Sequence, residues 1–167
     1  MPILSRRIEQ HGRLGAFARF VLEHQEMVYN VAFRILGEQE LASKITRDTF
    51  SRSFAIFAEF RGEAARLWLL RIATGLCHNQ LLRGGSQCTN GGTAGDSAQE
   101  MLCLLPPEQR ITLILSDIEG LGYREIADTT GVTVGIVNLR LSRGRTALRD
   151  ALLRHGEIFV GDEPWLT

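Results

Sequence analysis

The chain has 167 residues, of which 44% are hydrophobic and 23% are charged, a balance typical of a folded globular protein. Its 19 basic and 19 acidic residues cancel, which excludes a protein that holds DNA through a high overall positive charge. No apolar run reaches the length of a membrane span, and no phosphate-binding loop, HExxH motif or GxSxG motif occurs. The sequence therefore indicates neither membrane insertion nor an enzyme.

The cysteines give no sign of a metal site. Cys77, Cys88 and Cys103 are spaced too irregularly for zinc, and no CxxC pair occurs. Their odd number, together with the lack of a signal peptide, indicates a reducing cytoplasm. We therefore expect a cytoplasmic protein that has no catalytic residues, no cofactor and no metal.

The first half of the chain is predicted to form three helices. Apolar residues recur at helical spacing over 14–36, and Gly37 ends this helix. A second helix is predicted over 39–57 and a third over 67–83, with a short loop at 59–63 between them. No strand-like alternation persists anywhere, so the sequence predicts an all-α fold.

Residues 84–99 contain a stretch rich in Gly, Ser and Thr, which predicts a flexible linker. This linker divides the chain into an N-terminal domain at 1–83 and a C-terminal domain at 100–155, both small and helical. Residues 156–167 form a C-terminal tail whose role the sequence does not define. A flexible linker permits the two domains either to pack together or to separate.

The C-terminal half has the layout of a helix-turn-helix. Helices are predicted over 98–104 and 107–118, and the motif itself comes after them. Its first helix is predicted over 123–129, and Gly131 supplies a permissive backbone for the tight turn. Thr133 is the expected N-cap of a second helix, which bears several arginines. Such a pair of helices is what reading a major groove requires, so the sequence predicts DNA binding.

The residues of this second helix fall on two faces when successive positions are placed about 100° apart. The face predicted to be core carries Val134, Val137, Leu141 and Leu148. The opposite face carries Ile136, Leu139 and Arg143. The outward aliphatic side chains allow two interpretations, contact with thymine methyl groups or a patch that binds another protein.

Two stretches, taken together, resemble one known family. The first reads VYNVAFRILGEQELASKITRDTFSRSFAIFAEFRGEAARLWLLRIATGLCHNQLLR, and the second reads LPPEQR, a helix, and then EGLGYREIADTTGVTVGIVNLRLSRGRTALRDAL. In this order, over 17–153, they resemble regions two and four of the extracytoplasmic-function (ECF) sigma factors, the small two-domain members of the sigma-70 family. The resemblance implies an alternative sigma factor, a non-enzymatic subunit that binds core RNA polymerase and directs promoter recognition and opening in transcription initiation.

The resemblance also implies roles for particular residues. Region two would bind the clamp coiled coil of RNA polymerase through Ile45, Arg47, Asp48, Phe50 and Arg52. It would melt the downstream promoter element through Phe60, Arg61, Gly62, Glu63, Asn79, Gln80 and Arg83. Region four would touch the polymerase flap and read the upstream element through Thr133, Ile136, Asn138, Leu139, Arg140 and Arg143. An anti-sigma protein is a further implied partner, and the protein would act in the cytoplasm, at the nucleoid with RNA polymerase.

Promoter melting adds a requirement for aromatic side chains. An unstacked base needs an aromatic or apolar pocket, and polar groups for its edge. Phe54, Phe57, Phe60 and Trp68 lie near the loop that would receive the base. For Phe57 and Trp68 the alternative interpretation, as residues of the hydrophobic core, is favoured.

One stretch departs from the family pattern, at the expected polymerase-binding surface. Where the family usually shows D-A-E-D and then L-x-Q-E, residues 41–48 read LASK and then ITRD. Three acidic positions are lost, and Lys44 and Arg47 add positive charge. A second hypothesis therefore stays open: a sigma-like interaction protein, acting as an anti-sigma decoy or adaptor with altered polymerase binding. A third, a stand-alone helix-turn-helix regulator that binds an operator as a dimer, does not account for the region-two resemblance.

Overall fold

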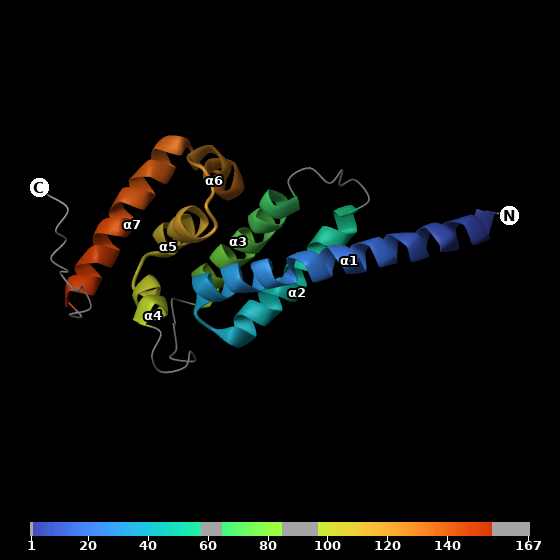
Figure 1. Cartoon of the computed structure of the whole chain (residues 1–167), viewed down its shortest axis with the longest axis horizontal. Helices are drawn as coiled ribbons and strands as arrows, with labels where there is room; N and C mark the ends of the chain where they lie inside the picture. The colour runs from blue at the N-terminus through green and yellow to red at the C-terminus, as the bar shows by residue number, and fades with distance from the viewer. Residues whose placement is uncertain (1, 58–64, 85–96, 155–167) are drawn as a thin grey trace, which may run out of the picture.

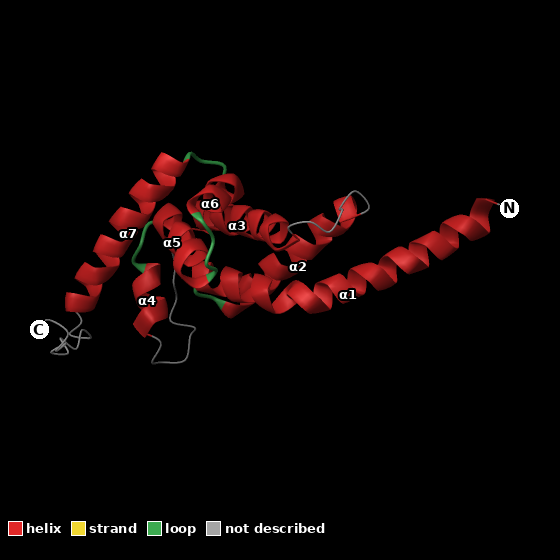
Figure 2. Ribbon diagram, turned by 45° about the horizontal axis from the view of Figure 1, so that its top comes forward, coloured by secondary structure: helices red, strands yellow, loops and turns green. Residues whose placement is uncertain are grey.

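The computed structural model describes residues 2–57, 65–84 and 97–154, with side chains for 12–57, 65–84 and 98–154. Within these residues every regular element is a helix and no strand occurs (Figure 2). The all-α prediction is therefore confirmed. The predicted loop at 59–63, most of the predicted linker and the tail lie outside the described residues.

Three long helices form the N-terminal half: α1 (Pro2–Leu36), α2 (Gln39–Ile56) and α3 (Ala65–Gly84). Each packs against the other two. The start predicted for α1 was too late, because the helix begins at Pro2 and extends beyond α2 and α3 (Figure 1). Gly37 ends α1 as predicted: its φ is 74°, and its N–H donates to the carbonyl of Phe33.

The C-terminal half contains α4 (Ser97–Cys103), α5 (Pro107–Leu113), α6 (Tyr123–Thr130) and α7 (Val134–Arg154). The helix predicted over 107–118 changes type within its length, because the π-helical turn η2 (Ile114–Ile118) comes directly after α5. Pro107 is at the first position of α5, as expected for a residue without an N–H. The predicted linker ends too late, since 97–99 belong to α4.

The two halves pack on a common hydrophobic core. One buried cluster contains Ile35 of α1 and Leu70 of α3 together with Ile114, Leu115 and Ile126 from the C-terminal half. The boundary between the halves is called the seam below. Along it α3 lies against α5 and α6, and α1 lies against α4 and α5 (Figure 1). Of the two arrangements that the sequence left open, the structure has the packed one.

Candidate nucleic-acid interface

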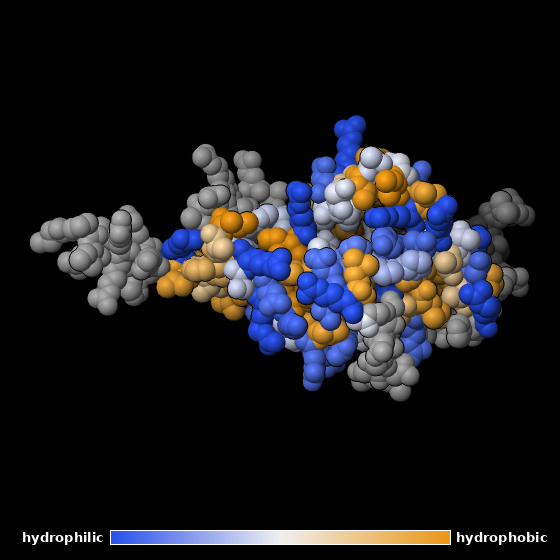
Figure 3. Space-filling model, turned by 180° about the vertical axis from the view of Figure 1, so that it is seen from behind, coloured by the Kyte–Doolittle hydropathy of each residue, from blue (hydrophilic) through white to orange (hydrophobic). Residues whose placement is uncertain are grey.

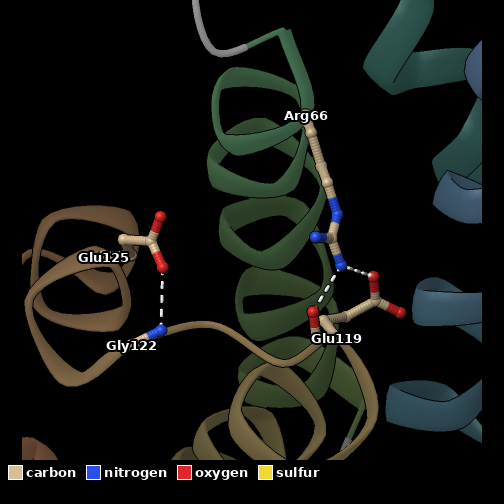
Figure 4. Close-up of polar contacts among 4 residues, drawn as sticks. All are labelled: Arg66, Glu119, Gly122 and Glu125. Carbon is tan, nitrogen blue, oxygen red and sulfur yellow. Dashed lines mark hydrogen bonds and ion pairs between the residues drawn. The ribbon is translucent and has the colours of Figure 1, made fainter.

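The helix-turn-helix has the predicted local geometry. Gly131 adopts the left-handed conformation with φ 70°, and its N–H donates to the carbonyl of Ala127 at the end of α6. The Thr133 hydroxyl accepts a 3.4 Å hydrogen bond from the Ile136 N–H, which caps the first turn of α7. The predicted turn and N-cap are confirmed. A further cap, not predicted from the sequence, lies at the start of α6, where the Gly122 N–H donates to the Glu125 carboxylate at 2.8 Å (Figure 4).

One face of α7 is buried, largely as predicted. Val137, Leu141 and Gly144 are in the core, and Leu148 is half-buried. The prediction for Val134 was wrong, because its side chain is 42% exposed. Angular placement on a helix gives the direction of a side chain but not whether a neighbouring element reaches that turn, and Val134 is the first residue of α7.

The outward face of α7 carries most of the predicted upstream-element residues. Ile136 is 40% exposed and Leu139 is 48% exposed. Thr133, Asn138 and Arg143 are exposed as well. Arg143 has no ion pair and no side-chain hydrogen bond within the described part of the chain. Its guanidinium is therefore available to a ligand.

Arg145 differs from Arg143 because it pairs inside the C-terminal half. Its Nη2 lies 2.6 Å from Oδ1 of Asp117, and it also reaches the Ser116 hydroxyl. The hydrogen bond from Arg145 lowers the pKa of Asp117, against the opposing effect of partial burial. Arg145 thus holds α7 against η2 and is not a free DNA contact.

Arg140 is half-buried and lies at the seam. It lines a cavity of about 270 Å³ between α3, α5, α6 and α7, together with His78 and Glu108. His78 Nε2 lies 3.4 Å from Glu108 Oε1 across the seam. The pKa of Glu108 is lowered, mainly because its carboxylate accepts a hydrogen bond from the backbone N–H of Glu108 itself. The hydrogen bond with His78 and the positive charge of Arg140 lower it further. Arg140 therefore faces Glu108 and does not lie on the outward face of α7 with Ile136, Leu139 and Arg143.

The residues predicted to bind polymerase divide between surface and core. Arg47 and Arg52 are exposed on α2, and Asp48 is half-buried. Ile45 and Phe50 lie in the hydrophobic core instead, so the prediction that they contact a partner directly is corrected. The sequence could not separate them, because both follow the apolar period that also fits a docking surface. A shallow groove of about 400 Å³ between α1 and α2 is lined by Ser43 and Arg47, among others.

Only part of the predicted downstream-element set lies in the described residues. Asn79 and Arg83 are exposed on α3, and Gln80 is half-buried. The remaining members, Phe60, Arg61, Gly62 and Glu63, lie outside the described residues.

The aromatic side chains near that loop pack against one another. Phe17 is 4.9 Å from Phe54 and 5.0 Å from Phe57, measured between ring centroids, and Phe20 is 6.2 Å from Trp68. Phe57 and Trp68 are half-buried against this cluster, which supports their interpretation as core residues. The Arg13 guanidinium lies over the Phe54 ring at 5.1 Å.

Polar groups that the sequence did not reveal join the two halves. The buried Arg110 donates to the carbonyls of Ile35 and Cys103, both at 2.7 Å, and to that of Leu105 at 3.0 Å. Gln99 donates to the Arg34 carbonyl at 3.0 Å. At the other end of the seam, Arg66 pairs with Glu119 at 2.8 Å (Figure 4). Arg110 follows Glu108 and Gln109 in α5, so the sequence did not distinguish it from a surface arginine.

The cysteines differ in state. Cys77 is buried, and desolvation raises the pKa of its thiol to about 12. Cys103 is disulfide-bonded, which differs from the reduced cysteines that the sequence led us to expect. Across the described ranges no group of three or more His, Cys, Asp or Glu side chains is placed to hold a metal ion. None of the helices in those ranges combines the length and hydrophobicity that a membrane span needs.

Comparison with known families finds two matches that together span most of the chain. Residues 20–87 match the family model Sigma-70 region 2. Residues 96–148 match Sigma-70, region 4.

Relatives of the same kind are found among known proteins. The ECF RNA polymerase sigma factor SigE of Mycolicibacterium smegmatis is 35% identical over 163 residues. That alignment covers 85% of this chain but 63% of the relative, so the chain spans less than two thirds of its length. The ECF RNA polymerase sigma factor SigW of Bacillus subtilis is 27% identical, with 90% and 97% of the two chains covered. The RNA polymerase sigma-H factor of Pseudomonas aeruginosa is 25% identical, with 86% and 89% covered.

Two solved structures share the fold. The sigma factor RpoE of Bartonella quintana, solved in complex with the anti-sigma factor NepR, superposes with a TM-score of 0.70 at 21% identity, covering 83% of this chain and 97% of the other. CnrH, solved in complex with the cytosolic domain of CnrY, superposes with a TM-score of 0.65 at 22% identity, covering 85% and 90%. At this level of identity the likeness establishes the fold.

Proposed function

This chain belongs to the ECF group of the sigma-70 family, and we propose that it is an alternative sigma factor that directs RNA polymerase to promoters and opens them when transcription begins. As such it is a non-enzymatic subunit, and it acts in the cytoplasm where the polymerase works. The observation that carries the proposal is the outward face of α7, which presents Asn138 and Arg143 from a capped helix-turn-helix in the same chain as a region-two helical bundle.

We assign upstream-element recognition to α7. In this docking geometry the N-terminal part of the second helix enters the major groove. The exposed residues that meet the DNA directly are Thr133, which caps α7, and Ile136, Asn138, Leu139 and Arg143 on α7 itself. Arg140 joins them only when region four moves away from α3, since in the packed arrangement it lines the seam cavity beside Glu108.

We assign polymerase binding to the exposed side of α2. Arg47, Asp48 and Arg52 contact the clamp coiled coil, while Ile45 and Phe50 support that surface from the core. Region four contacts the polymerase flap. An anti-sigma protein is a further proposed partner, since both solved structures of the same fold are complexes, one of them with an anti-sigma factor by name.

Downstream melting is assigned to the end of region two. Asn79, Gln80 and Arg83 of α3 contact the separated strand together with the loop Phe60, Arg61, Gly62 and Glu63. Affinity for free DNA is weak, because the chain has a net charge of zero and each region offers few phosphate contacts. Specificity comes from joining two weak readers to one polymerase.

The test is reconstitution with core RNA polymerase from the host of the gene. We expect the tagged chain to recover the core subunits in a one-to-one complex, and this complex to start transcription at promoters that core polymerase alone does not use. Arg143→Ala should keep polymerase binding and reduce upstream-dependent transcription, whereas Arg149→Ala, at an exposed arginine further along α7, should change neither. Failure to recover polymerase would contradict the proposal.

The second candidate, an anti-sigma decoy or adaptor, is favoured by one observation. Lys44 stands where the family usually has an acidic residue and Arg47 where it usually has Gln, and Arg47 is exposed beside the groove between α1 and α2. A decoy would bind a purified anti-sigma protein but not core polymerase. The variant Lys44→Glu with Arg47→Glu should then create polymerase binding, whereas in a working sigma factor adapted to its own polymerase it should weaken binding.

A further inference from the structure

Two branched aliphatic side chains lie where a helix-turn-helix presents its base contacts. Ile136 and Leu139 are within the first two turns of α7, on the side opposite the buried Val137 and Leu141. In Figure 3 apolar surface gathers at the top of the molecule, over the end where α6 meets α7. Because the first turns of the second helix reach the base edges in this motif, this exposed apolar surface faces the groove.

The surroundings of the pair indicate DNA as the occupant. Residues three apart on a helix are neighbours, so Ile136 and Leu139 form one contact surface, and Arg143 continues it one turn later. Five arginines and one acidic residue lie on α7, which complements the charge of a phosphate backbone. The exposed Asn138 and Arg143 beside the pair can make polar contacts to a base edge or a phosphate, which adds to this complementarity.

The chemistry of the pair selects one base. An aliphatic side chain neither donates nor accepts a hydrogen bond, so it cannot recognise the polar edges of guanine, cytosine or adenine. Thymine alone adds a methyl group to the major-groove edge. Other polar readers on α7 are engaged elsewhere, since Arg145 pairs with Asp117 and Arg140 lines the seam cavity. Apolar contacts therefore carry a large share of base selection.

We propose that Ile136 and Leu139 read thymine methyl groups in the upstream promoter element, so that this sigma factor prefers thymine at two neighbouring base pairs. The inference rests on the proposed function and deepens it, because it names the chemical group that the helix recognises. Arg143 and Asn138 supply the polar contacts that fix the register of α7 in the groove.

The experiment uses the holoenzyme reconstituted from core polymerase and the full chain. A promoter library with a randomised upstream element is first selected by binding, and the selected promoter is then made with uracil in place of each upstream thymine. Uracil pairs as thymine does but lacks the methyl group. Loss of one methyl contact should weaken holoenzyme binding about fourfold. This is the change in affinity that corresponds to the transfer free energy of one buried methyl-sized group.

Variants separate a methyl contact from an effect of uracil on DNA shape. Ile136→Ala and Leu139→Ala should each lose sensitivity to uracil at one position, while a shape effect would persist in both variants. Leu153→Ala is the matched control, because Leu153 is an exposed aliphatic residue at the far end of α7. It should retain the full difference between thymine and uracil.

The outcomes distinguish the two proposals. Equal binding of thymine and uracil promoters by a holoenzyme that still selects an upstream element would overturn the methyl readout and leave the sigma function standing. Unchanged uracil sensitivity in both alanine variants would overturn it too, as would alanine variants that lose a protein partner but bind DNA normally. A chain that forms no holoenzyme would overturn the proposed function, and the inference with it.

Discussion

Arg110 of α5 donates a 2.7 Å hydrogen bond to the main-chain carbonyl of Ile35, the penultimate residue of α1. The last carbonyls of a helix receive no hydrogen bond from an N–H of the same helix. When such carbonyls are buried, they need a donor from another element. A fully buried guanidinium from region four supplies that donor for region two. Gln99 does the same for the preceding carbonyl, that of Arg34.

Replacing Arg110 should therefore destabilise the whole chain. Arg110→Met keeps most of the volume but leaves buried carbonyls of Ile35, Cys103 and Leu105 without this donor. We expect a loss of about 3 kcal/mol or more in the free energy of unfolding, measured by urea denaturation. Arg149→Ala should change this free energy by less than about 0.5 kcal/mol, since that side chain is exposed. Equal effects would contradict a structural role for Arg110.

Two glycines inside helices should respond oppositely to alanine. A Cβ at Gly144 would lie 2.8 Å from Leu113 Cδ1, whereas a Cβ at Gly75 of α3 has no heavy atom within 4 Å. Gly75→Ala should stabilise the protein by about 0.5–1 kcal/mol through helix propensity. At Gly144 the clash should outweigh that gain, with a net loss of about 1 kcal/mol.

Thermal or urea unfolding of the two variants is the measurement. Stabilisation of both to the same extent would show that α7 does not depend on close approach to Leu113. A Gly144→Val variant would enlarge the effect, because its additional methyl groups meet the same buried neighbour.

The pair of Asp117 and Arg145 should make stability depend on acid pH. Because the pKa of Asp117 is lowered in the folded state, its stabilising contribution is present above the unfolded pKa of about 3.9 and is lost as pH falls through the folded pKa. Asp117→Asn should therefore be less stable than the parent at pH 6, by at most about 1 kcal/mol for a pair this exposed. The urea midpoints of the parent and of Asp117→Asn should differ less at pH 3 than at pH 6. A gap of constant size would contradict the pairing.

Cys77 should report opening of the core. Burial raises its pKa to about 12, so the thiolate that reacts with iodoacetamide is almost absent at pH 8 in the folded protein. We expect mass spectrometry of the peptide that contains Cys77 to show no modification under native conditions and full modification in urea. Rapid labelling of that peptide in the native protein would mean that α3 separates from the core on a short timescale.

Local chemistry was predictable from the sequence, and contacts between distant segments were not. Gly131 and Thr133 were predicted correctly because a turn and a cap depend on a few adjacent residues. Val134 was predicted wrongly, because a helical period does not say where a neighbouring helix ends. Arg110 could not be assigned, since its partner at Ile35 is a main-chain carbonyl 75 positions away and carries no side-chain signature.

At the candidate site, too, local features were predictable from the sequence and contacts between distant helices were not. The outward direction of Ile136 and Leu139 followed from angles along one helix and is confirmed. Whether Ile45 and Phe50 face a partner or the core depended on how α1 and α3 pack around α2, which no local pattern encodes. The half-burial of Arg140 depended on the position of α3 beside the helix-turn-helix.

The core shared by the two halves limits how far regions of this protein can be exchanged with those of relatives. A hybrid that joined its first 84 residues to another region four would keep Ile35 and Leu70 at the boundary, shaped to fit Ile114 and Ile126. It would also keep the end of α1, whose carbonyls rely on Gln99 and Arg110. Designers of orthogonal transcription switches built from such hybrids should therefore transplant 97–130 of this chain together with its region two, because α4, α5 and α6 all pack on α1 or α3, and exchange only the residues beyond 130.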